Sequence, residues 1–90
     1  MGPDTLLLLL DLAAHATDSP EGTVVAASYR DVARRLGVSK DTVGRRMAVL
    51  RRLGVVAEDR QRAADRFEVR SYVLHLEAAG VTRELVTVAA

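Results

Sequence analysis

The alternation of hydrophobic and polar residues first indicates a helix over residues 4–16. Pro3 favours an extended entry into this helix, and Asp4 is expected to be its N-cap. The five leucines at positions 6–10 cover every side of such a helix, which predicts burial on more than one face. The next residues, 17–22, have the sequence TDSPEG and are rich in turn formers, so they predict a loop.

Two further helices are predicted in the middle of the chain. One is expected to begin at Ser28, because Ser28 and Asp31 resemble a capping box, and to end at Gly37. Ser39 is then expected to cap a third helix over residues 40–53, whose apolar residues recur at helical spacing.

Gly44 lies inside the third predicted helix, where a glycine costs about 1 kcal/mol relative to alanine. We expect it to serve function by allowing close approach of a ligand backbone or by leaving space for Arg45 to move. A tolerated glycine at an exposed position is the alternative.

The period of the pattern shifts toward two after Gly54, which indicates strands. Strands are expected at residues 23–27, 55–58 and 67–76. The last of them changes phase near Arg70, which suggests a bulge, and a polar connection over residues 59–66 precedes it. The tail, residues 77–90, has no clear period and is compatible with a short helix, a strand or a frayed end.

The turn between the second and third helices carries a specific pattern. Ala33 is small enough for two helices to approach closely, and Gly37 tolerates a positive φ angle. Val38 fills the angle between the helices before the Ser39 cap. Two helices joined in this way and followed by a hairpin have the element order of a winged helix-turn-helix.

The phrase DVARRLGVSKDTVGRRMAVLRRLGVV closely resembles the winged helix-turn-helix of bacterial transcriptional regulators. The phrases RFEVRSYVLHL and SYRDVARRLGVSKDTV are similar to small actinobacterial DNA-binding domains, and the resemblance covers residues 23–76. It implies an α+β, mainly helical fold with three helices and a two- or three-stranded wing. The length of 90 residues predicts one domain over residues 1–90, divided into a leucine-rich helix (4–16), a helix-turn-helix (28–53), a wing (55–76) and a tail (77–90).

The resemblance implies that the third helix enters the major groove of DNA. The recognition residues expected from it are Ser39, Lys40, Asp41, Thr42, Gly44, Arg45 and Arg46. Arg45 and Lys40 are long donors suited to guanine. Asp41 is better explained by the positive helix N-terminus than by a base contact, and Arg46 has the alternative of lying along its own domain.

One tyrosine and five arginines are further candidates for contacts with the DNA backbone or minor groove. In the second helix and the wing these are Tyr29, Arg30, Arg34, Arg60, Arg62 and Arg66. For the wing the alternative is that its arginines only keep an exposed hairpin soluble. Arg51 and Arg52 suit either the negative end of the helix dipole or a phosphate.

Charge is distributed unevenly along the chain. Residues 30–70 hold twelve basic and six acidic residues, a balance of +6, whereas the rest holds Arg83 and six acids, a balance of −5. A basic middle between acidic ends suggests a face that binds a polyanion, although an arginine-rich solvated surface is equally compatible with charge alone.

The leucine run is too short to span a membrane and lacks the basic start of a signal peptide. Its surplus apolar surface instead predicts a homodimer. The interface candidates are Leu6, Leu7, Leu9 and Leu10. The chain has no cysteine, which excludes disulfides and thiolate chemistry and fits a cytoplasmic, nucleoid-associated protein.

No motif for catalysis, a metal, a cofactor or a small-molecule ligand is recognisable, and His15 and His75 are expected to be structural. The leading hypothesis is a dimeric, sequence-specific protein that binds double-stranded DNA and regulates transcription. A plasmid or mobile-element protein for partition, replication or transfer, and a winged-helix protein-interaction module that does not bind DNA, are the alternatives.

Overall fold

The computed structural model describes residues 2–20, 22–59 and 69–80. Its helices are α1 (Pro3–Ala14), α2 (Tyr29–Leu36), α3 (Lys40–Arg52) and the short 3-10 helix η1 (Leu76–Ala79). Its strands are β1 (Thr17–Ser19), β2 (Gly22–Ala27), β3 (Val56–Glu58) and β4 (Arg70–Leu74). The described part of the chain is thus an α+β fold of three α-helices and a four-stranded antiparallel sheet, which is compatible with a winged helix.

Helix α1 begins one residue earlier than expected, with Gly2 as N-cap and Pro3 in the first turn. Asp4 is therefore inside the first turn, where its charge suits the helix dipole, and it is not the cap. Proline fits this position because its missing N–H group has no partner at a helix start anyway.

One face of α1 is buried within the chain, and the predicted burial of a second face against another copy stays a prediction. Leu8, Leu9 and Leu12 are almost completely buried, whereas Leu6 and Leu7 remain 37% and 56% exposed. Leu9 is consequently a core residue of its own chain and is unavailable to a second copy, contrary to its selection as an interface candidate. Leu10 is half-buried and packs against the core.

The connection between α2 and α3 follows the sequence pattern closely. Gly37 has the left-handed φ angle of 69° at the end of α2, and the Val38 N–H donates to the Ala33 carbonyl at 3.0 Å. The Ser39 hydroxyl accepts from the Thr42 N–H at 3.1 Å, as an N-cap should. Ser28 is the N-cap residue of α2, but its side chain makes no capping bond, so the expected capping box is not formed.

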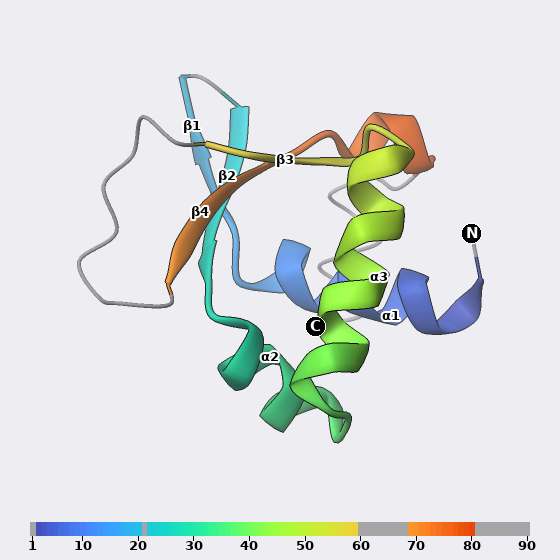
Figure 1. Ribbon diagram of the computed structural model, residues 1–90. Helices are drawn as coiled ribbons and strands as arrows, with labels where there is room; N and C mark the ends of the chain where they lie inside the picture. Colours follow the sequence, from blue (N-terminus) through green and yellow to red (C-terminus); the bar gives the residue numbers. More distant parts are fainter. Residues whose placement is uncertain (1, 21, 60–68, 81–90) are drawn as a thin grey trace.

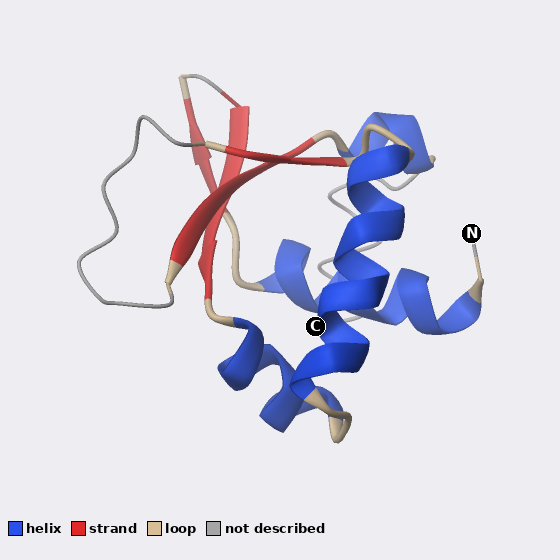
Figure 2. Cartoon of the chain, in the orientation of Figure 1, coloured by secondary structure: helices blue, strands red, loops and turns tan. Residues whose placement is uncertain are grey.

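The sheet has the strand order β1-β2-β4-β3, with all neighbours antiparallel. Figure 2 shows the strands gathered on one side of the helices. The central pair β2–β4 aligns Val25 with Tyr72, and the outer pair aligns Val56 with Leu74. β1 falls where a loop was expected. Its three polar residues carry no alternation, and their pairing with β2 defines the strand.

The predicted strand over residues 67–76 is shorter in the structure. β4 ends at Leu74, and Leu76 begins η1 with its side chain still buried. Residues 67 and 68, the rest of the wing connection from residue 60, and residues 81–90 lie outside the described ranges. The predicted wing therefore lies only partly within the described residues.

One hydrophobic core joins the helices to the sheet. α1 contributes Leu8, Leu9 and Leu12; α3 contributes Val43, Met47 and Leu50; the sheet contributes Val25, Val56, Tyr72 and Leu74. Figure 1 shows α1 crossing behind α3, the sheet to one side of both helices, and α2 at the foot of α3. Among the described residues, no helix has the length and apolar character needed to cross a bilayer.

Candidate nucleic-acid interface

The outer side of the first turns of α3 carries a chain of hydroxyl contacts. The Ser39 and Thr42 hydroxyls are 2.8 Å apart, and the Arg45 guanidinium donates to the Thr42 hydroxyl at 3.1 Å. Arg45 is exposed. Because its partner is a neutral hydroxyl, this bond orients the guanidinium without compensating its charge.

Most predicted recognition residues share this region. Lys40 and Asp41 are exposed, and Thr42 and Gly44 are partly exposed. Asp41 is in the first turn of α3, which fits its expected role at the helix dipole.

Arg46 differs from the other predicted recognition residues because it is turned toward α1. Its guanidinium lies 3.5 Å from the Asp4 carboxylate, and its side chain is only 23% exposed. The side chain therefore lies along its own domain, the alternative that the sequence left open, and we remove Arg46 from the candidate interface.

Arg35 of α2 is likewise turned toward α1, in a contact that the sequence did not reveal. Its guanidinium donates two hydrogen bonds to the Asp11 carboxylate, at 3.1 Å and 2.8 Å. Hydrogen bonding to Asp11 raises the pKa of Arg35 against the opposing effect of partial burial. Asp11 is only 12% exposed, so this paired contact helps to fix α1 on the helix pair.

Tyr29 covers Gly44. A Cβ atom added at Gly44 would lie 3.7 Å from Cε2 and 3.9 Å from Cδ2 of the Tyr29 ring, which is ordinary van der Waals contact. The missing side chain would thus point toward the Tyr29 ring, and a role of Gly44 in DNA binding stays a prediction. A methyl group would fit here against the ring, so the Tyr29 contact does not itself require a glycine.

The Tyr29 hydroxyl accepts a hydrogen bond from Arg51 at 3.2 Å. The Arg51 guanidinium carbon also lies 5.7 Å from the centre of the Tyr72 ring, within the range of a cation–π contact. Burial, reinforced by the Tyr29 hydroxyl, raises the pKa of Tyr72 well above its usual value, so this phenol is neutral at physiological pH.

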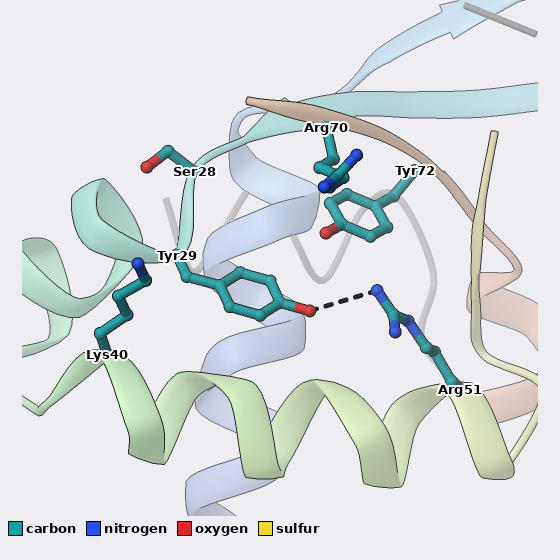
Figure 3. A pocket seen from close by; sticks show the side chains of 6 residues that line it. All are labelled: Ser28, Tyr29, Lys40, Arg51, Arg70 and Tyr72. Atoms are coloured by element: carbon teal, nitrogen blue, oxygen red, sulfur yellow. Dashed lines mark hydrogen bonds between the residues drawn. The ribbon is translucent and has the colours of Figure 1, made fainter. Parts of the chain in front are cut away.

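These side chains line a pocket of about 250 Å³ between α3, the start of α2 and β4. Its lining residues are Ser28, Tyr29, Lys40, Arg51, Arg70 and Tyr72. Figure 3 shows the Tyr29 ring between Lys40 at one end of α3 and Arg51 at the other, with Arg70 and Tyr72 above it. Three of the six residues are cationic, and one of them, Arg70, lies 3.6 Å from the Glu58 carboxylate.

The sequence placed Tyr29 in the site but missed Arg70 and Tyr72 and left Arg51 undecided. Arg70 and Tyr72 alternate on β4, and only the pairing of β4 with β2 brings them to α3. This pairing is continuous from residue 70 to residue 74, so the bulge predicted near Arg70 is not formed there. Lys40 and Arg51 are eleven residues apart, which places them on the same side of one helix. This spacing is the one sequence signal that could have assigned both residues to one site.

The remaining candidates are less informative. Arg30 and Arg34 are exposed on α2, and Arg34 lies 3.9 Å from Asp31. Arg60, Arg62 and Arg66 lie outside the described residues. Within the described ranges, no group of three or more acidic or histidine side chains could hold a metal ion.

Comparisons of the chain with protein-family models, with curated proteins and with solved structures found no match.

Proposed function

We propose that this protein binds double-stranded DNA in a sequence-specific manner and regulates transcription. The observation that carries the proposal is that the arginines of α2 and α3 fall into two sets with different partners. Arg35 and Arg46 pair with carboxylates of α1, whereas Arg45 and Arg51 contact neutral hydroxyls on the other sides of the helix pair. The second arrangement leaves positive charge available to an external polyanion.

The element order supports the same proposal. β2 precedes the α2–α3 pair, and β3 and β4 follow it and join β2 in one sheet. We assign this arrangement to the winged helix-turn-helix, with β1 as an addition at the sheet edge. In that fold, α3 enters the major groove.

In this docking, Arg45 and Lys40 reach base edges from the N-terminal half of α3. A bidentate arginine–guanine contact contributes about 1–3 kcal/mol of discrimination between bases. Tyr29, Arg30 and Arg34, at the start of α2, contact the DNA backbone and set the register.

A homodimer would place two such helices on half-sites about one helical turn apart. Leu6 and Leu7, exposed on α1, are its remaining interface candidates with Leu10. Sedimentation equilibrium of the Leu7→Ser variant tests this part: a shift from dimer to monomer is expected, and a monomeric parent protein would contradict it.

Selection of binding sites from random duplex DNA, followed by a salt titration on the selected sequence, tests the proposed function. We expect a defined sequence and an affinity that falls steeply with salt. A single palindrome favours a repressor or activator, and a tandem array favours a partition protein. Failure to bind any duplex at low salt would reject DNA binding and leave the protein-interaction module as the better hypothesis.

A further inference from the structure

The pocket that contains Arg51 has the composition of an anion site. Three cationic side chains and the Tyr29 and Tyr72 phenols line it, and the phenols supply hydroxyl groups and ring faces. Phosphate oxygens accept hydrogen bonds from all of these polar groups, and guanidinium is especially suited to them. We propose that this pocket binds phosphate groups, with Arg51 as its anchor.

Arg51 is held in place by neutral partners. The bond to the Tyr29 hydroxyl uses one of the five N–H donors of the guanidinium, and the Tyr72 ring supports its charge at 5.7 Å. Both tyrosines belong to elements packed around α3, so the guanidinium is oriented before a ligand arrives. Pre-orientation lowers the entropy that binding must overcome.

The spacing of Lys40 and Arg51 along α3 indicates what kind of phosphate ligand fits. Lys40 and Arg51 are eleven residues apart on α3, which corresponds to about 16 Å along a helix. A run of backbone phosphates, spaced about 3.4 Å per strand along a duplex axis, extends over this distance, whereas one small anion occupies one end. The inference therefore rests on the proposed function for its main ligand, the DNA backbone. A free phosphorylated molecule is the other source of the same chemistry.

The two tyrosines give a direct readout. The chain contains two tyrosines and no tryptophan, and both tyrosines line this pocket. Intrinsic tyrosine fluorescence therefore reports on the pocket itself. We would titrate the full chain with sodium pyrophosphate at constant ionic strength and, separately, with duplex DNA of random sequence.

Both titrations are expected to change the tyrosine emission in a saturable manner. Arg51→Gln should weaken pyrophosphate binding by about tenfold or more, because it removes a charged hydrogen-bond donor. Arg51→Lys keeps the positive charge but loses the planar, forked set of N–H donors, so its affinity for pyrophosphate should fall less than that of Arg51→Gln. Arg52→Gln is the matched control: it removes the same charge from the next residue, which does not line the pocket, and should leave the pyrophosphate response unchanged.

The outcomes separate this inference from the proposed function. If the protein binds DNA but tyrosine emission does not respond and Arg51→Gln binds like the parent, the pocket inference is overturned and DNA binding stands. If pyrophosphate binds in an Arg51-dependent manner but DNA does not, the pocket is a site for a small phosphorylated molecule and the proposed function fails. If Arg51→Gln and Arg52→Gln lose pyrophosphate binding equally, the effect comes from the overall positive charge of the protein and not from the pocket. That result would overturn the inference.

Discussion

The arginines on the α1-facing side of the α2–α3 pair differ from those on its other sides in the partners that they contact. Arg35 and Arg46 contact the carboxylates of Asp11 and Asp4. Arg45 and Arg51 contact the hydroxyls of Thr42 and Tyr29. A carboxylate partner neutralises an arginine and joins two elements, whereas a hydroxyl partner only orients it. The first set therefore serves the fold, and we infer that the second serves binding.

The difference also explains why the number of basic residues along the chain is a weak guide to the positive charge that a ligand can reach. Arg45 and Arg46 are neighbours in sequence, yet consecutive residues on an α-helix point about 100° apart. One of them is therefore exposed on the outer side, and the other lies against α1. The balance of +6 in residues 30–70 includes charge that is already compensated by acids from the N-terminal helix.

The largest effect is expected from Arg45→Gln. It should lower affinity for a selected DNA site by about 1–3 kcal/mol and relax the preference at the base that Arg45 contacts. Folding stability should change little, since Arg45 is exposed. Mobility-shift titrations on the selected site and on a one-base variant measure both quantities, with Arg46→Gln as the matched control. A larger loss of affinity in Arg46→Gln would reverse our assignment of the two neighbours.

A second prediction concerns the α1-facing side. Asp11→Asn removes the charge that pairs with Arg35 and should lower the free energy of unfolding by about 1–2 kcal/mol. DNA affinity at a temperature where the variant is folded should remain that of the parent. Urea denaturation measures the stability, and Asp4→Asn is the control, since Asp4 is 71% exposed and its pair should contribute less. Loss of DNA affinity in folded Asp11→Asn would show that the two sides are not independent.

Gly44→Ala addresses the contact between Tyr29 and α3. The added methyl group meets the Tyr29 ring at ordinary contact distance, so the variant should gain up to about 1 kcal/mol from helix propensity. Thermal unfolding measures this gain. Gly44→Leu is the contrasting variant. Its large side chain must displace the Tyr29 ring, and with it the hydroxyl that accepts the hydrogen bond from Arg51. If Gly44→Ala destabilises the protein, the ring is packed more tightly than the distances indicate.

Local signals allowed much of the helical half to be predicted from sequence. Gly37 and Ser39 specify the turn through a positive φ angle and a side-chain cap, and both act within a few residues. The spacing of Val43, Met47 and Leu50 likewise specified the buried face of α3. These features depend on neighbours along the chain, so a single sequence contains them.

What the sequence did not reveal depends on contacts between distant segments. β1 is defined by its pairing with β2, and its own residues TDS resemble a loop. Leu9 and Leu7 are chemically identical, and only the packing of α1 on the core buries one and exposes the other. The pocket combines the ends of α3 with β4, and no local pattern indicates that these segments meet.

The smallest predicted effect is a difference in the pH dependence of stability. Burial raises the pKa of Tyr72 above its unfolded value of about 10, so the folded state holds this proton more tightly than the unfolded state. The resulting stabilisation is complete below about pH 10 and is lost as the pH rises above that value. Tyr72→Phe removes the titrating group, so its melting temperature should fall less steeply than that of the parent between pH 9 and pH 11, roughly the window around the unfolded pKa. Parallel curves for the two proteins would mean that Tyr72 titrates normally.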